Sequence, residues 1–187
     1  EGSLLEQAVL ASLPEFVEFA NTVADTARSI SLGYFRADPE LLIKSDGSPV
    51  TVADRETERV IRDMLSRSYP QHAVIGEEYG WAPSDQPYTW VVDPIDGTKS
   101  YLAGAPTYGM LLALLYNGTP VLGVIDIPAL DERWCGAVGQ TTTMNGQPVK
   151  TRACTAVEQA VLTIISPDYL KDGERLAVDE LSRIARV

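Results

Sequence analysis

The sequence predicts an α+β fold in which helices come first and a mostly antiparallel sheet follows. Near the N-terminus, apolar residues recur at three- and four-residue steps, the spacing of an amphipathic helix; they are Phe16, Phe19, Ala20, Val23, Ala27 and Ile30. Farther along, apolar runs over 107–116 and 120–126 flank Asn117-Gly118, which is typical of a hairpin, and Asn145-Gly146 marks another turn. Helices followed by a run of strands favour a layered architecture.

The first elements are helical. Residues 4–13 have helical spacing, Pro14 opens a second helix, and Gly33 ends it. Residues 41–51 are strand-like with a Gly-Ser-Pro turn inside. Asp54 then has the chemistry of an N-cap, and the helix that it begins ends at Tyr69-Pro70.

The remaining elements alternate between apolar runs and turn residues. Strands are expected over 73–77, 89–93, 107–116, 120–126, 132–138 and 161–165, and a helix over 172–187. Residues 81–87 form a polar loop. We expect a domain over residues 1–140 and the start of a second one over 141–187.

Composition excludes several classes of protein. The net charge of −11 argues against binding to a nucleic-acid backbone, and no apolar run is long enough to cross a membrane. Cys135 and Cys154 form no metal-ligand pattern and are expected to be buried and reduced, as in a cytoplasmic protein. His72, the only histidine, follows Tyr69-Pro70 and is expected at the surface, which disfavours a Ser-His-Asp triad.

Two acidic pairs mark a candidate metal site. Asp93 and Asp96 follow the apolar run 88–92, and Glu77-Glu78 follow another apolar run. Close carboxylates repel unless a shared proton or a cation neutralises them. Carboxylate oxygens suit a hard cation, most simply Mg²⁺. A plain Asp-Pro turn with an Asp cap is the structural alternative.

These motifs carry a family resemblance. Residues 76–78 (Gly-Glu-Glu), 90–98 (Trp-Val-Val-Asp-Pro-Ile-Asp-Gly-Thr) and 44–54, with Lys44 and a Thr-x-x-Asp helix start, resemble the inositol monophosphatase family of Mg²⁺-dependent phosphatases. The resemblance implies a layered αβαβα sandwich of the inositol monophosphatase and fructose-bisphosphatase type. Nothing after Ile165 resembles the family's later Trp-Asp element, so the C-terminal part is expected to be missing.

The resemblance also implies roles for individual residues. Asp93 would bridge two Mg²⁺ ions, Glu77 and the backbone carbonyl of Ile95 would complete one ion's protein ligands, and Asp96 would serve the other. Glu77, Thr98 and Asp54 would be the catalytic residues, with Thr98 and Asp54 orienting the attacking water. Gly97 and Thr98 would hold a phosphate oxygen through their N–H groups. The roles of two residues stay open. Lys44 either approaches the phosphate or is a solvated loop lysine. Glu78 either helps hold a third ion or is an ordinary exposed acid.

The implied reaction is hydrolysis of a small phosphorylated alcohol by metal-activated water. Residues 97–106 and 117–126, followed by Glu132-Arg133-Trp134, resemble the histidinol-phosphate phosphatase branch, which acts in histidine biosynthesis. L-histidinol phosphate is therefore the expected substrate, with inositol 1-phosphate as the alternative. A non-catalytic module that binds metal or phosphate is the third hypothesis. The family also implies a homodimer and two or three ions per site.

Overall fold

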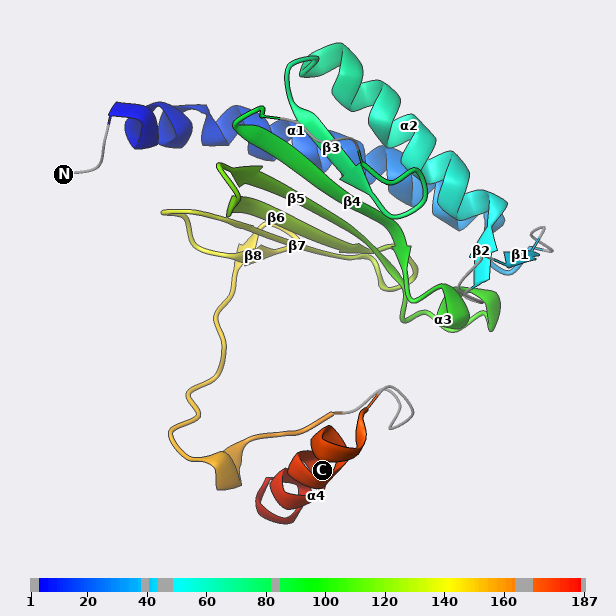
Figure 1. The fold of residues 1–187 in the computed structure, drawn as a ribbon, viewed down its shortest axis with the longest axis vertical. Coiled ribbons are helices and arrows are strands. Elements are labelled where there is room, and N and C mark those ends of the chain that lie inside the picture. The colour runs from blue at the N-terminus through cyan, green and yellow to red at the C-terminus, as the bar shows by residue number, and fades with distance from the viewer. Residues whose placement is uncertain (1–3, 38–40, 44–48, 82–84, 164–169, 186–187) are drawn as a thin grey trace. The chain divides into compact units, whose positions relative to one another are not determined.

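A seven-stranded sheet with two helices on one face forms most of the described structure (Figure 1). The computed structural model describes residues 4–37, 41–43, 49–81, 85–163 and 170–185 of the 187. The sequence made predictions for Lys44, Ile165 and the turn over Gly47-Ser48-Pro49; Lys44, Gly47, Ser48 and Ile165 lie outside these ranges. The chain divides into two compact units, Glu1–Val149 and Lys150–Val187.

The first unit begins with two helices separated by a hairpin. The hairpin consists of β1 (Leu41–Ile43) and β2 (Pro49–Thr51), which pair antiparallel, and it leads directly into α2 (Val52–Ser68). The first helix, α1 (Leu4–Tyr34), runs through Pro14, so the break expected there is wrong. Proline removes one helical hydrogen bond, but Leu13 and Phe16 lie on either side of it in the same buried core. Continued burial of that stripe outweighs the lost bond.

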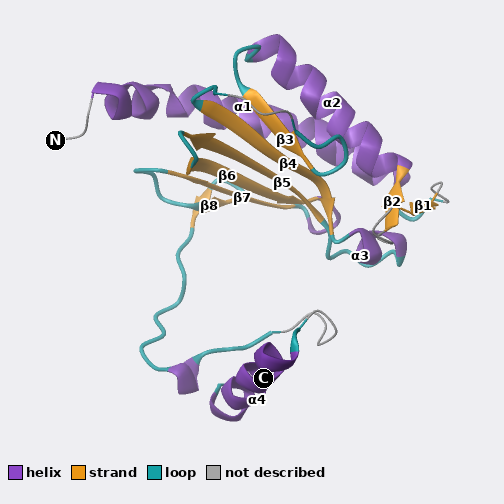
Figure 2. Ribbon diagram, in the orientation of Figure 1, coloured by secondary structure: helices purple, strands orange, loops and turns teal. Residues whose placement is uncertain are grey.

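The sheet has the order β3-β4-β5-β6-β7-β8-β9. Its strands are β3 (Ala73–Gly76), β4 (Tyr88–Asp96), β5 (Gly109–Tyr116), β6 (Thr119–Ile127), β7 (Glu132–Ala137), β8 (Thr143–Met144) and β9 (Gln147–Pro148). Only the β3–β4 pair is parallel. Short helices follow β4 (α3, Thr98–Leu102) and β6 (η1, Pro128–Leu130) (Figure 2). The predicted α+β order, helices first and a mostly antiparallel sheet after them, is confirmed.

Turn chemistry explains the hairpins. Asn117 and Gly118 both have positive φ (48° and 78°), as do Asn145 and Gly146 (49° and 75°). Positive φ at both central residues is the requirement of the tight turn that matches strand twist. The hairpin at Asn117-Gly118 and the turn at Asn145-Gly146 are therefore confirmed, and this turn joins β8 to β9 within the sheet. Residues 141–149 group with the first unit, while the division into domains at residue 140 stays a prediction.

The second unit contains η2 (Val157–Gln159) and α4 (Asp172–Ile184). The predicted C-terminal helix is confirmed over its described residues. The predicted strand over 161–165 is not confirmed. Val161 makes only an isolated bridge, and residues 162–163 have no regular structure. An apolar run of this length does not by itself distinguish a strand from an irregular segment. Within the described residues, no helix is long and apolar enough to cross a membrane.

The main core lies between the sheet and the helices α1 and α2. Alternate residues of the central strands point to this side and are buried, because side chains alternate across a strand. They include Trp90 and Val92 of β4, Met110, Leu112 and Leu114 of β5, and Leu122 and Val124 of β6. Asp93, the next residue after Val92, therefore belongs to the opposite face of the sheet.

His72 lies in an aromatic cluster beside this core, so the surface position expected for it is wrong. Its ring stacks on Tyr69 (4.8 Å between centroids) and Tyr88 (4.7 Å). The Nε1–H of Trp90 donates a hydrogen bond to His72 Nδ1 at 3.1 Å. The apolar strand and aromatic neighbours cover the imidazole, and this burial lowers its pKa from 6.5.

Acidification is therefore expected to destabilise the protein through His72. The unfolded chain binds this proton more tightly than the folded one, so stability is complete above pH 6.5 and is lost as pH falls through the lowered pKa. The loss is expected because protonation of His72 is disfavoured only in the folded state. Urea denaturation at pH 7.5 and 5.0 measures it. His72→Gln keeps an acceptor for Trp90 and cannot titrate, so this variant should lose less stability; an equal loss would contradict the prediction.

The two cysteines are both free. Cys135 is partly buried, whereas Cys154 is exposed, so the expectation of burial is wrong for Cys154. Cys154 belongs to the irregular segment before η2 rather than to the sheet.

Candidate metal and phosphate site

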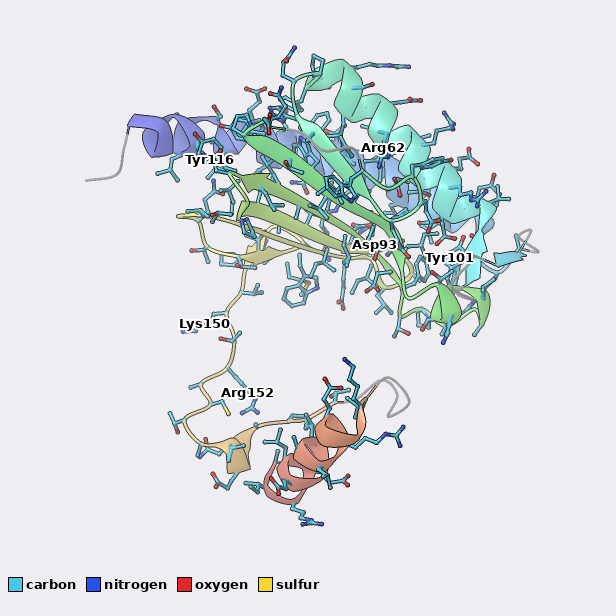
Figure 3. The ribbon with its side chains drawn as sticks, viewed as in Figure 1. Arg62, Asp93, Tyr101, Tyr116, Lys150 and Arg152 are labelled. Carbon is cyan, nitrogen blue, oxygen red and sulfur yellow. The ribbon has the colours of Figure 1, made fainter. Side chains whose placement is uncertain are left out.

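The carboxylates meet where two parallel strands end side by side. In the β3–β4 pair, Gly76 lies opposite Val92, and the N–H of Glu77 donates to the carbonyl of Val92 at 3.2 Å. Glu77 and Asp93 therefore leave neighbouring strands at the same level. Figure 3 shows Asp93 at the end of β4 that leads into α3. The sequence predicts strand ends here, and the parallel register explains how residues so far apart along the chain meet.

Asp93 is held in an environment that disfavours its charge. Burial, then the negative charge of Glu77 and a hydrogen bond with its side chain, and then the charge of Asp96 raise the pKa of Asp93 to about 8. A hydrogen bond between two carboxyl groups requires a proton on one of them. A shared proton is one of the two ways in which close carboxylates are neutralised, and a bound cation is the second.

One oxygen of this group has no partner. Asp93 Oδ1 is buried and makes no hydrogen bond, which is costly for a carboxylate oxygen. Within the described residues, no three His, Cys, Asp or Glu side chains are already arranged as a complete metal site. The residues nonetheless fit a hard cation, because a buried oxygen without a donor lies beside two more carboxylates.

The segment after Asp93 leaves the regular strand. The β4–β5 register shifts between Asp93 and Asp96, so that Asp96 is exposed while Ile95 is buried. Gly97 has a φ of 84°, a conformation that suits glycine, and is the N-cap of α3. The predicted short helix at Gly97-Thr98 is therefore confirmed as structure. Glu78 is partly buried and interacts with neighbouring groups.

Thr98 and Asp54 come together across two elements. The hydroxyl of Thr98 lies 3.5 Å from Asp54 Oδ1 and 3.2 Å from the carbonyl oxygen of Ile95, so its one proton has two acceptors. Asp54 is fully buried, and this burial is the largest cause that raises its pKa; the nearby charge of Glu77 adds to it. The structure thus places Asp54, Glu77 and Thr98 in one small region.

Asp54 is not the N-cap of α2. Thr51 occupies that position, and Asp54 is the third helical residue, in a capping box. The N–H and hydroxyl of Thr51 both donate to Asp54 Oδ2, at 2.7 and 2.5 Å. Oδ1 of the same carboxylate is thereby left to face Thr98. The capping role that was expected of Asp54 belongs to Thr51, and the capping box fixes the orientation of Asp54.

A second, smaller core anchors α3. Ile95, Tyr101 and Tyr108 are buried together with Ala53, and Phe35 packs against them. The hydroxyl of Tyr101 donates to the carbonyl of Ser31 at 2.7 Å, which ties α3 to α1. Sequence reasoning did not identify Tyr101. Its place three residues after Thr98, in a helix too short to be stable alone, was the available signal.

Gly76 is required by space, not by backbone conformation. A Cβ at this position would lie 1.9 Å from Glu58 Oε1, a separation that forces the neighbouring groups to move. Sequence reasoning did not identify Glu58 either. The available signal was a charged residue three and seven positions before Ile61 and Leu65, on the buried stripe of α2.

Gly76→Ala is accordingly expected to destabilise the fold by about 1–3 kcal/mol, the usual cost of overpacking. Thermal unfolding measures the change. Gly33→Ala is the matched control, because nothing lies within 4 Å of its added Cβ and it lies near the end of α1. That control should be neutral or stabilising. A Gly76→Ala protein as stable as the unmodified one would contradict the close approach.

A cavity of about 530 Å³ lies elsewhere, between α1 and β7–β8, and none of the candidate ligands lines it. Its lining includes Arg28, Asp131 and Arg133. The arginines converge on the buried carboxylate of Asp126. These contacts join α1 to the sheet, and the site residues are not among them.

Comparison with known proteins agrees with the geometry. The model of the inositol monophosphatase family matches residues 12–178. The chain belongs to the inositol monophosphatase family. Its members are metal-dependent phosphatases, and they hydrolyse phosphoric monoesters. Enzymes of this kind need oxygen ligands for their metal ions, and the carboxylates at the end of β4 are oxygen donors.

Three similar proteins illustrate this membership. The chain is 43% identical over 162 residues to "Bifunctional phosphatase IMPL2, chloroplastic" from Arabidopsis thaliana, covering 86% of this chain and 47% of that protein. It is 37% identical over 157 residues to "Histidinol-phosphatase" from Chlorobaculum parvum, covering 83% and 61%. A solved inositol monophosphatase from Zymomonas mobilis matches with a TM-score of 0.81 and 35% identity, covering 92% and 67%. The chain thus spans about half to three fifths of these curated relatives.

The structural match confirms the predicted fold class. The described part contributes a helical layer, α1 with α2, packed on one sheet, as in inositol monophosphatases. Other solved members of the family match at similar coverage. Substrate names among the relatives are divided between histidinol-phosphatase and inositol monophosphatase.

Proposed function

We propose that the protein is a Mg²⁺-dependent phosphomonoesterase that hydrolyses a small phosphorylated alcohol, with L-histidinol phosphate, giving L-histidinol in histidine biosynthesis, as the substrate. The observation that carries the proposal is the buried, unpartnered Oδ1 of Asp93 between the charges of Glu77 and Asp96. Support for the substrate comes from the relatives named histidinol-phosphatase, one of them 37% identical.

The ligand set follows from the placement of the carboxylates. Asp93 would bridge two ions, with Glu77 and the carbonyl of Ile95 on one and Asp96 on the other; Glu78 would help hold a third. When bound, the ions make water more acidic and offset the charge of the phosphate and of the departing alkoxide. The proposed number is two or three Mg²⁺ per site.

The chain's own groups would prepare the nucleophile. Thr98 donates its proton toward Asp54 or Ile95, which leaves hydroxyl lone pairs to accept from a water. Asp54, whose pKa is raised by burial, is suited to take up a proton through Thr98. The N–H groups of Gly97 and Thr98 would hold a phosphate oxygen. Water is the nucleophile, and no covalent phosphoenzyme is required. Lys44 lies outside the described residues, and both of its roles, contact with the phosphate and a solvated loop lysine, stay open.

Inositol 1-phosphate is the second candidate substrate. The match to the inositol monophosphatase from Zymomonas mobilis supports it. The proposed catalytic residues would contact the phosphate and not the alcohol. They therefore do not distinguish L-histidinol phosphate from inositol 1-phosphate. A non-catalytic module that binds metal or phosphate is disfavoured, because the carboxylates, Thr98 and Asp54 lie together.

Phosphate release from the two substrates, side by side, tests the proposal. The full-length protein is assayed with Mg²⁺ and again with a chelator. We expect chelator-sensitive release and a higher kcat/KM for L-histidinol phosphate. Preference for inositol 1-phosphate would transfer the assignment to the second candidate. Mg²⁺ binding without release from either ester would instead identify a binding module.

A homodimer and a cytoplasmic location complete the proposal. The homodimer rests on the family alone, and the free cysteines agree with a reducing compartment. One relative is named as chloroplastic. Light scattering after size-exclusion chromatography would determine the oligomeric state.

A further inference from the structure

A buried carboxylate on α2 contacts the backbone that carries Glu77. Glu58 is completely buried on the core side of α2. Its Oε2 accepts a hydrogen bond from the N–H of Glu78 at 2.6 Å, and its Oε1 accepts one from the N–H of Tyr79 at 3.2 Å. Both bonds are charge-assisted and go to consecutive amides of the turn after β3, so they fix its orientation.

The close approach of Gly76 makes these bonds possible. Because Gly76 has no Cβ, Glu58 Oε1 reaches the space that a side chain would fill. Arg62 closes the other side: its Nε donates to Glu58 Oε1 at 2.7 Å, and its Nη2 donates to the carbonyl of Gly80. The N–H of Gly76 donates to the same carbonyl at 3.1 Å. The segment 76–80 is thus folded around one carboxylate and one guanidinium.

Glu77 is held from both sides as a result. Its own N–H is bonded to Val92 of β4, and the next N–H is bonded to Glu58. We propose that Glu58 is a positioning residue for the cation site, which sets the backbone of Glu77 so that its carboxylate faces Asp93. The inference rests on the proposed function, since it concerns the same site, and assigns a role to a residue outside the ligand set.

Packing alone does not explain a charge at this position. Ile61 and Leu65 continue the buried stripe of α2, and an apolar residue at position 58 would satisfy the core without the cost of burying a carboxylate. A charge is useful here because two amide N–H groups and Arg62 point at it. Partners that orient a metal ligand typically change metal affinity about 10–100-fold when removed.

Two measurements on the full chain test the proposal. Calorimetry with Mg²⁺ gives the affinity of the unmodified protein and of Glu58→Gln, Glu58→Asp and the control Glu56→Gln. Hydrogen exchange by NMR, without metal, reports the protection of the Glu78 and Tyr79 amides. The control removes the same charge from α2, but its side chain accepts from Tyr34 and not from the turn.

We expect Glu58→Gln to bind Mg²⁺ about 10–100-fold more weakly, Glu58→Asp to be intermediate, and Glu56→Gln to stay within about twofold. The Glu78 and Tyr79 amides should be protected in the unmodified protein and lose protection in Glu58→Gln. A folded Glu58→Gln protein with unchanged affinity would show a merely structural role and overturn the proposal. So would rapid exchange of both amides in the unmodified protein, which decides the matter even where the variants do not fold.

Failure of the proposed function has a different signature. An unmodified protein that binds no Mg²⁺ would overturn the metal site itself. The amide protection would then still show whether Glu58 holds the turn. The two assignments are therefore tested separately.

Discussion

Asp93→Asn is expected to abolish the proposed Mg²⁺-dependent phosphatase activity while the protein stays folded. Asparagine has nearly the shape of aspartate, so β4 and its buried neighbours Val92 and Ile95 need not move. The amide carries no charge, however, and cannot bridge two cations. Because bound ions contribute several kcal/mol to catalysis of this kind, kcat/KM should fall by about 10²–10⁴-fold or more.

Stability should respond in the opposite direction in metal-free buffer. Burial and the charge of Glu77 already disfavour the ionised form of Asp93, so its removal should leave the midpoint of thermal unfolding unchanged or higher. Asp85→Asn, an exposed aspartate before β4, is the matched control and should change neither property. Full activity of Asp93→Asn would overturn the site assignment.

Asp126→Asn is expected to be the most destabilising of these substitutions. Asp126 is completely buried in β6. Arg28 of α1 donates to its two oxygens at 3.1 and 2.8 Å, and Arg133 of β7 donates to Oδ1 at 2.7 Å. Removing the charge leaves two guanidiniums without their common counter-ion. Breaking a buried ion pair from one side costs about 3–5 kcal/mol.

Urea denaturation measures this loss. Asp63→Asn is the control, since the same change breaks an ion pair with Arg59 in which both side chains are more than half exposed. Exposed pairs of this kind contribute about 0–1 kcal/mol. Equal stability of the two variants would show that the Asp126 cluster is solvated and contributes little.

Local chemistry predicted much of the site. The Asp-Pro-Ile-Asp-Gly-Thr segment, the acidic pair at residues 77–78 and both Asn-Gly turns depend on neighbours within a few positions. The Thr-x-x-Asp pattern gave the start of α2 but not the division of roles, because Thr51 and Asp54 are both good capping residues. In a capping box the bonds are reciprocal, and only the backbone angles show that Thr51 is the N-cap.

Long-range contacts account for what the sequence did not predict. Glu58 contacts amides 20 and 21 positions away, and Arg28 contacts Asp126 98 positions away. His72 was placed at the surface because its neighbours in sequence are polar, whereas its ring packs on Tyr88 and Trp90 of β4. Pro14 was expected to break a helix that core packing keeps continuous.

The parallel pairing of β3 with β4 also bears on the order of folding. Ala73 pairs with Thr89, so this pairing closes only a short loop of chain. The hydrogen bond between Arg28 and Asp126 instead joins residues that are 98 positions apart. Short closures lose less chain entropy and form faster. We therefore expect the carboxylates to assemble while α1 is still undocked. An ion at the proposed metal site would then bind a partly folded chain and speed the completion of folding, before any part in the proposed catalysis.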